Sequence, residues 1–321
     1  MNWIVVGAVL GIMATVFVMW LAIQLKSGKK LIKSSHIGKS KPEEVRAFYN
    51  DQTENFLKVY GEVIQAFRTT DVSKLLDYQI ESIGFEEGWK VLDAGCGVCG
   101  PARYFAKTAK VEVDAVTISD DQVNRSIDLI KADNQEGSVR VHHGDYHYLE
   151  SILQPETYNA VYFLESFGHA QDQAKVLDSA WNMLKPGGTL YIKDLFLKEG
   201  AFPGHEKAIK AEADNINAAY RYNISDLYYV LRHLRKSGFI ISFVKTIDLK
   251  LEEFENLTIS NDFQELTGIN KIENLRDYVF PVDFFEIKCF KPWTNVMEGN
   301  SRYFLQNLYF MQVEGWKKEQ L

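Results

Sequence analysis

The chain has 321 residues, of which 46% are hydrophobic and 25% are charged, and its formal net charge is -7. This composition is typical of a globular protein and excludes a largely disordered chain. The acidic balance argues against nucleic-acid binding, which needs a basic face for phosphates, and favours a small-molecule or lipid substrate.

The N-terminal segment has the composition of a membrane anchor. Trp3–Ile23 contains no charged residue, and about 20 apolar residues are enough to cross a bilayer as a helix. We therefore predict a transmembrane anchor over residues 1–25 and a basic linker over residues 26–41, whose lysines place the following domain on the cytoplasmic side. No signal-peptide cleavage site follows. Gly7 and Gly11 have the spacing of a helix-pairing motif, and thus of a possible homo-oligomer, but this spacing often arises by chance.

The next segment, residues 42–84, has apolar residues at helical spacing and is predicted to form two or three helices ahead of the core, as an N-terminal substrate cap. The apolar positions are Val45, Phe48, Phe56, Val59, Tyr60, Val63, Ile64 and Phe67.

Residues 85–197 alternate short apolar runs with helical patterns, which predicts an α/β fold with a mostly parallel sheet and helices on both faces. The predicted strands are Lys90–Ala94, Val111–Ile118, Val139–His143, Ala160–Leu164 and Thr189–Asp194.

Residues 198–321 complete the predicted fold. They contain two helical patterns and an aromatic-rich insertion between two strands that would close the sheet. The helices are Glu206–Tyr220 and Ile224–Ser237, and the strands are Phe239–Thr246 and Leu308–Trp316.

The segment Val91–Gly100 is a strand that runs into a glycine-rich turn. Gly95, Gly97 and Gly100 allow close approach of a ligand to the backbone, and their GxGxxG spacing brings a dinucleotide into consideration. Asp93 precedes the first glycine by two residues, and no acid ends the second strand, where dinucleotide enzymes bind the ribose. Both features argue against a dinucleotide.

Asp93-x-Gly-x-Gly97 resembles the motif of class I S-adenosylmethionine-dependent methyltransferases. Gly144-Asp145-Tyr146 after the third strand and Leu184-Lys-Pro-Gly-Gly188 before the fifth follow in that family's order. The resemblance implies a Rossmann-like, seven-stranded methyltransferase sheet with S-adenosylmethionine as cofactor. Asp93 and Gly95 would then hold the methionine end, Thr117 and Gln122 the ribose, and Asp145 the adenine. The cofactor-binding residues implied are Asp93, Gly95, Gly97, Thr117, Gln122, Asp145, Tyr146 and Glu165.

Two further segments resemble sterol and isoprenoid C-methyltransferases. The block Phe48–Gly61 matches the aromatic block that precedes the glycine turn in that family, and Glu165-Ser-Phe-Gly-His169-Ala170 matches its Glu-x-x-x-His-Ala motif. The residues in register in the block are Phe48, Tyr49, Thr53, Phe56, Tyr60 and Gly61. Leu57 stands where sterol enzymes carry an acid.

This resemblance implies methylation of an alkene, which leaves a carbocation without a lone pair. Such a reaction needs aromatic faces for cation–π stabilisation and a base to remove a proton. The candidate catalytic residues are Tyr49, Phe56 and Tyr60 for the faces, and Glu165, His169 and Asp194 for proton removal. Each of these residues has an alternative role. The aromatic residues would then be part of the hydrophobic core, His169 would cap a helix or hydrogen-bond to the backbone, and Glu165 would orient the cofactor.

Several acceptors remain open. A hydrophobic acceptor such as a sterol fits a membrane anchor, and a prenyl diphosphate would require basic residues, of which Arg221, Arg232, Arg235 and Lys236 are candidates. Cyclisation of the cation is a further option. The alternatives are an N- or O-methyltransferase acting on a lipid head group, quinone or tocopherol-like ring, and a non-enzymatic membrane protein that keeps the fold.

The three cysteines, Cys96, Cys99 and Cys289, are too few for a disulfide framework and suit a reducing compartment. The single Cys96-x-x-Cys99 pair lies inside the glycine turn and has no second pair, and no histidines show metal-ligand spacing. We therefore predict no metal.

Overall fold

The computed structural model of the chain describes residues 39–249 and 279–293. Within these two ranges no helix is both long and apolar enough to cross a membrane. The predicted anchor Trp3–Ile23 and the predicted strand Leu308–Trp316 lie outside the described residues.

The described chain forms a Rossmann-like sheet of seven strands in the order β3-β2-β1-β4-β5-β7-β6. The first five strands are parallel, and β7 is antiparallel to both of its neighbours. Their bounds are β1 Lys90–Ala94, β2 Glu112–Thr117, β3 Val139–His143, β4 Tyr158–Leu164, β5 Leu184–Leu197, β6 Ile240–Thr246 and β7 Val282–Phe290. The central strands are buried on both faces, which explains why they are almost continuous apolar runs.

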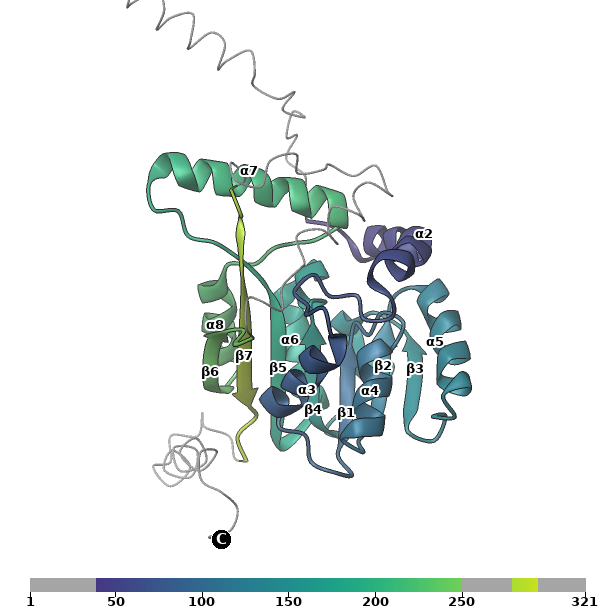
Figure 1. The fold of residues 1–321 in the computed structure, drawn as a ribbon. Coiled ribbons are helices and arrows are strands. Elements are labelled where there is room, and N and C mark those ends of the chain that lie inside the picture. The colour runs from purple at the N-terminus through teal and green to yellow at the C-terminus, as the bar shows by residue number, and fades with distance from the viewer. Residues whose placement is uncertain (1–38, 250–278, 294–321) are drawn as a thin grey trace, which may run out of the picture. The chain divides into compact units, whose positions relative to one another are not determined.

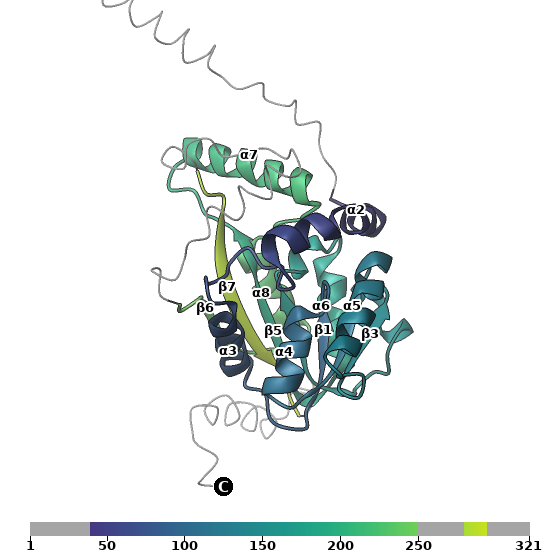
Figure 2. The same cartoon turned by 45° about the vertical axis from the view of Figure 1, so that its right-hand side comes forward.

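Helices cover both faces of this sheet (Figures 1 and 2). One face packs against α3 (Val72–Ile83), α4 (Gly100–Thr108) and α5 (Asp120–Ala132). The other packs against α6 (Gln173–Met183) and α8 (Leu227–Lys236). Together these two layers enclose the hydrophobic core and fix the strand ends that carry the site.

Strand β7 closes the sheet between β5 and β6. Its residues were predicted to belong to the aromatic-rich insertion. Of the two strands that were predicted to close the sheet, Phe239–Thr246 corresponds to β6 within one residue. β7 pairs along its whole length with β5, from Leu197↔Val282 to Thr189↔Phe290. A strand that pairs with such a distant segment leaves no local signal of its position in the sheet.

Two helices lie beyond the carboxyl ends of the parallel strands, α2 (Pro42–Tyr60) and α7 (Pro203–Tyr220). Helix α2 is joined to the start of α5 by an Arg46–Asp120 ion pair of 2.5 Å and by a hydrogen bond of 2.6 Å from Ser119 to the side chain of Asn50. The strand order reverses between β1 and β4, so the crevice below α2 is where an open α/β sheet binds ligands.

Candidate active site

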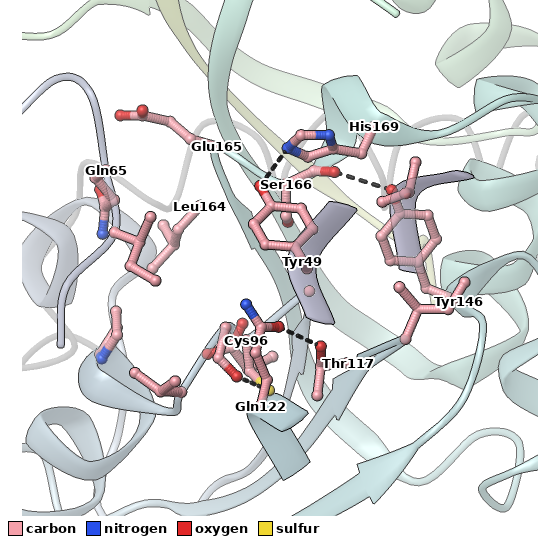
Figure 3. A pocket seen from close by; sticks show the side chains of 18 of the residues that line it. Tyr49, Gln65, Cys96, Thr117, Gln122, Tyr146, Leu164, Glu165, Ser166 and His169 are labelled. Atoms are coloured by element: carbon pink, nitrogen blue, oxygen red, sulfur yellow. Dashed lines mark hydrogen bonds between the residues drawn. The ribbon is translucent and has the colours of Figure 1, made fainter. Parts of the chain in front are cut away.

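A pocket opens at this edge of the sheet, at the ends of β1 to β4 (Figure 3). It contains about 840 Å³ of empty space, part of which is open solvent. Of the predicted catalytic residues, Tyr49, Glu165 and His169 line it. The predicted cofactor-binding residues that line it are Asp93, Gly95, Gly97, Thr117, Gln122, Asp145, Tyr146 and Glu165.

The glycine turn after β1 can form only with small residues. Gly95 has φ +94°, and a Cβ there would lie 2.4 Å from the Cβ of Ser166. A Cβ at Gly100 would lie 2.1 Å from the carbonyl oxygen of Glu62, which crosses directly above the turn. The two glycines therefore let β4 and the segment after α2 close around the end of β1.

Asp93 presents a buried carboxylate to the pocket. The residue is only 2% exposed, and its Oδ2 atom has no hydrogen-bond partner among the described residues. Burial raises the pKa of Asp93 to about 8. An orphaned acid of this kind fits the ammonium group at the amino-acid end of S-adenosylmethionine, since a cation would stabilise its charged form.

Thr117 and Gln122 form a polar pair at the end of β2. The Thr117 hydroxyl donates to Oε1 of Gln122 over 2.6 Å, which leaves Nε2 of Gln122 buried and without a partner among the described residues. A donor held toward the pocket in this way fits a ribose hydroxyl.

Asp145 is fixed by His147, which the sequence analysis did not identify. The carboxylate accepts from the backbone N–H of His147 over 2.9 Å and from its ring Nδ1 over 2.5 Å. Ring atom Nε2 accepts from the backbone N–H of Asp172, which sets the tautomer. Although burial opposes it, hydrogen bonding to His147 lowers the pKa of Asp145. The sequence signal for this pair was that Asp145 and His147 stand two residues apart just after β3.

Tyr49 and His169 form a direct pair across the pocket (Figure 3). The Tyr49 hydroxyl lies 2.7 Å from Nε2 of His169, and Nδ1 of His169 lies 3.1 Å from the carbonyl oxygen of Arg221. A carbonyl only accepts, so Nδ1 carries the proton and Nε2 accepts from Tyr49. Burial lowers the pKa of His169 to about 4 and raises the pKa of Tyr49. The pair is therefore neutral and joins α2 to the loop that follows β4.

Phe56 and Tyr60 do not line the pocket. Phe56 stacks on Tyr49 with ring centroids 5.6 Å apart, and Tyr60 packs behind Phe56 at 5.8 Å. Both residues are buried. Of the three predicted aromatic faces, only Tyr49 reaches the pocket, and the other two support it.

Glu165 is engaged by groups that sequence reasoning missed. Its carboxylate accepts from the backbone N–H groups of Ala66 at 2.5 Å and Phe67 at 3.1 Å, and it forms an ion pair with Lys193 of β5. Lys193 is completely buried and also donates to Gln65 Oε1 over 2.8 Å. The segment Glu62–Phe67, here termed the strap, is thereby fastened at the pocket wall. These contacts give Glu165 a structural role.

Asp194 lies behind the pocket wall. It is fully buried and accepts hydrogen bonds from the Tyr222 hydroxyl and from the backbone N–H groups of Gly168 and Leu195. Burial raises the pKa of Asp194 to about 7. Because these donors occupy its oxygens and it does not line the pocket, it holds the Gly168–His169 loop in place.

Asn223 joins the beginning of the described chain to this same loop. Its Oδ1 atom accepts from the backbone N–H of Ser40 over 2.8 Å, and its Nδ2 atom lies within 3.2 Å of the carbonyl oxygens of Ser40 and Ala170. We call this set of bonds the Asn223 clasp.

The basic residues proposed for a diphosphate lie elsewhere. Arg221 ends α7 and donates to the carbonyl oxygen of Ala218, while the other three belong to α8, which packs against α6 and β6. None of the four lines the pocket: Arg221, Arg232, Arg235 and Lys236. All four are exposed, Arg221 at the end of α7 and the other three on the solvated face of α8.

Cys96 and Cys99 are buried in the glycine turn with their sulfur atoms 3.5 Å apart. Among the described residues there is no group of three or more His, Cys, Asp or Glu side chains arranged to hold a metal ion. The absence of a metal stays a prediction.

Residues 92–192 match the family described as a methyltransferase domain. The chain is 27% identical over 161 residues to the sterol 24-C-methyltransferase erg-4 of Neurospora crassa, with 48% of this chain and 42% of that protein covered. It is 32% identical over 122 residues to the sterol 24-C-methyltransferase ERG6B of Gibberella zeae, with 38% and 32% covered. The matched part thus spans less than half of the length of these relatives.

Solved structures share the fold at low sequence identity. The [4+2]-cyclase SpnF has a TM-score of 0.67 at 16% identity, with 80% of this chain and 98% of that chain covered. Geranyl diphosphate C-methyltransferase of Streptomyces coelicolor A3(2) has a TM-score of 0.59 at 13% identity, with 78% and 97% covered. Since a cyclase and a methyltransferase share it, the fold alone does not define the reaction.

Residues 92–192 are thus a methyltransferase domain, and the fold is the Rossmann-like one that class I S-adenosylmethionine-dependent methyltransferases share. Within this class the chain resembles the sterol and isoprenoid C-methyltransferases, and its cofactor is S-adenosylmethionine.

Proposed function

We propose that the enzyme transfers a methyl group from S-adenosylmethionine to an alkene carbon of an isoprenoid. The new carbocation then loses a proton, with or without cyclisation. The named sterol 24-C-methyltransferase relatives support this acceptor class. The neutral Tyr49–His169 pair at the pocket wall is the observation that carries the proposal.

Part of the pocket wall is suited to an apolar acceptor. Val45 of α2, Ile64 of the strap and Leu164 at the end of β4 contribute aliphatic side chains, and Tyr49 of α2 contributes an aromatic ring. Aliphatic walls bind hydrocarbon by excluding water, and an aromatic face stabilises a nearby carbocation.

The bound cofactor would supply an electrophilic methyl group to the alkene. Tyr49 has an oxygen lone pair available for the proton that the cation must release, and its own proton moves along the existing hydrogen bond to Nε2 of His169. The Arg221 carbonyl stabilises the resulting imidazolium through Nδ1. A weakly basic pair is sufficient, because a carbocation with an adjacent C–H bond is a very strong acid.

The charge of the pocket favours an uncharged isoprenoid such as a sterol over a diphosphate. Among the described residues that line the pocket there is no lysine or arginine to pair with a diphosphate, and hydrogen bonding to His147 lowers the pKa of Asp145, which keeps that lining acid negative. An anionic acceptor would therefore have no cationic side chain to bind it, whereas an uncharged acceptor needs none.

We further propose that the enzyme works at a membrane, with its catalytic domain on the cytoplasmic side. The uncharged stretch Trp3–Ile23 and the lysines after it support this placement. An anchored enzyme would meet a hydrophobic acceptor in or near the bilayer, where such a substrate partitions.

Detergent-solubilised full-length protein, incubated with methyl-labelled cofactor and separately with a sterol, a prenyl diphosphate and a quinone, tests the acceptor. We expect label in the apolar extract of the sterol reaction, with a new C–CH3 group by mass spectrometry. The proposal is contradicted if label appears only in O- or N-methylated products, or if none of the three reactions gives a labelled product. Asp93→Asn serves as the control, because it weakens cofactor binding without touching the acceptor wall.

Glu165→Gln does not separate a carbon acceptor from a nitrogen or oxygen acceptor. The substitution leaves the buried ammonium of Lys193 without its counter-ion and loosens the strap whichever acceptor is used. Tyr49→Phe is more discriminating, since it removes the proposed proton acceptor and keeps the aromatic ring.

A further inference from the structure

Gln65 places an unpartnered donor on the pocket wall. Its side chain is 2% exposed and lines the pocket, and its Nε2 atom has no hydrogen-bond partner among the described residues. A buried amide N–H left without an acceptor costs about 1–3 kcal/mol, so a donor of this kind signals that a ligand supplies its acceptor.

The orientation of this amide is dictated by its neighbours. Oε1 of Gln65 accepts from Nζ of Lys193 over 2.8 Å and from Nε2 of Gln79 over 2.7 Å. A lysine ammonium has three donors and no acceptor, so the oxygen of Gln65 must face Lys193. The ion pair with Glu165 holds Lys193 in place, and the nitrogen of Gln65 is left as the free end of the amide.

The strap places Gln65 beside the turn that receives the amino-acid end of the cofactor. The neighbouring Ile64 lies 3.8 Å from the position of a Cβ on Gly97, and Glu62 crosses above Gly100. The same pocket contains the orphaned Oδ2 of Asp93. An amino-acid zwitterion needs an acceptor for its ammonium group and a donor for its carboxylate, and the pocket offers one unpartnered group of each kind.

We infer that Gln65 Nε2 binds the α-carboxylate of the cofactor and that Lys193 is a positioning residue that fixes the Gln65 amide for this contact. Gln122, which also lines the pocket, shows the same construction: the Thr117 hydroxyl occupies Oε1 and leaves Nε2 free for a ribose. Two glutamines, each with its side-chain oxygen bonded to a protein donor, would thus bind two different parts of one ligand through their amide nitrogens.

Calorimetric binding of S-adenosylhomocysteine and 5′-methylthioadenosine to the full-length protein tests the inference, because the second ligand lacks the amino-acid end. Gln65→Glu keeps an oxygen for Lys193, replaces the free donor with a second oxygen and adds a negative charge that repels a carboxylate. We expect about a ten- to hundredfold loss of affinity for S-adenosylhomocysteine, and a change of less than about threefold for 5′-methylthioadenosine. Gln122→Glu is the matched control and should weaken both ligands, since both contain ribose.

Equal losses for both ligands in Gln65→Glu, or no loss for either, overturn the inference. If that variant does not fold, Gln65→Met removes the donor with similar side-chain volume and carries the same expectation. Lys193→Met tests the positioning role: it should reduce the ratio of the two affinities, whereas a purely structural lysine would leave that ratio unchanged.

Discussion

The burial of Asp93 carries a cost in stability, which its proposed contact with the cofactor would offset. Burial raises its pKa to about 8, above the usual carboxyl value near 4, so the folded protein holds a proton that the unfolded chain releases. The carboxylate therefore lowers stability progressively as the pH rises from about 4 to about 8, and the lowering is constant above that.

Asp93→Asn is expected to raise the melting temperature of the cofactor-free protein and to weaken cofactor binding at least tenfold. The asparagine carries no ionisation cost, so the gain in stability should be larger at pH 8 than at pH 5, reaching on the order of a few kcal/mol. Thermal unfolding at the two pH values and calorimetry with S-adenosylhomocysteine measure the two effects. A variant that is less stable than the wild type at pH 8 would contradict this assignment.

The Tyr49–His169 pair predicts a particular pH dependence of turnover. Because burial lowers the pKa of His169 to about 4, its ring stays neutral above about pH 5 and can accept from Tyr49. Turnover at saturating substrate should fall as the pH decreases through about 4, with no inflection from His169 between pH 6 and 8. Tyr49→Phe should lower kcat about a hundredfold or more with little change in cofactor affinity. An inflection near pH 6.5 that disappears in His169→Asn would refute the assignment.

At the scale of single residues, motifs predicted residues that line the pocket but not the contacts that support them. Asp93, Thr117 and Asp145 were predicted because each stands at or just after the end of a strand in a recognisable motif, and all three line the pocket. Lys193 and Gln65 left no such signal. They are distant in sequence, and their meeting depends on the closed sheet.

Among the elements, the strap is the part most dependent on tight packing. Its approach to α4 requires a residue without a Cβ at position 100, because the carbonyl oxygen of Glu62 would lie 2.1 Å from such an atom. The obstacle is backbone, which cannot rotate away as a side chain would. The strap and the glycine turn therefore form one unit.

Gly100→Ala is expected to destabilise the protein by about 1–3 kcal/mol and to weaken cofactor binding, since the strap must move away from the turn. Gly137→Ala is the matched control, because Gly137 is exposed and a Cβ there meets nothing within 4 Å. Denaturant unfolding and calorimetry of the two variants provide the comparison. Similar stabilities for both variants would show that the strap is not packed against Gly100.

Element prediction succeeded where hydrophobic patterns are local. Strands β1 and β3 have the predicted bounds, since each is a short segment of five residues set between helical patterns. Strand β7 was missed because it carries Asp283, Glu286 and Lys288 among its aromatic residues. Glu286 is fully buried, and its carboxylate accepts hydrogen bonds from tyrosine hydroxyls on α3 and β5. These contacts are seen only in the tertiary structure.

For the whole molecule, the fold class followed from the order of strands and motifs, whereas the predicted anchor lies outside the described residues. Deletion of residues 1–25 is expected to move the protein from the membrane fraction to the supernatant of disrupted cells. The cofactor affinity of the shortened protein should be unchanged, and its turnover of a sterol presented in vesicles should fall several-fold. Fractionation and a vesicle assay test this, and membrane retention of the shortened protein would contradict the anchor.

The Asn223 clasp determines where the catalytic unit begins. A chain shortened to start at Lys39 keeps Ser40 and every bond of the clasp, whereas one that starts at Pro42 leaves a buried amide without those partners. Because the same amide holds the carbonyl of Ala170, the loop that presents His169 would lose a support although no residue of that loop had changed. The boundary of the catalytic unit therefore lies at residue 40, ahead of its first helix.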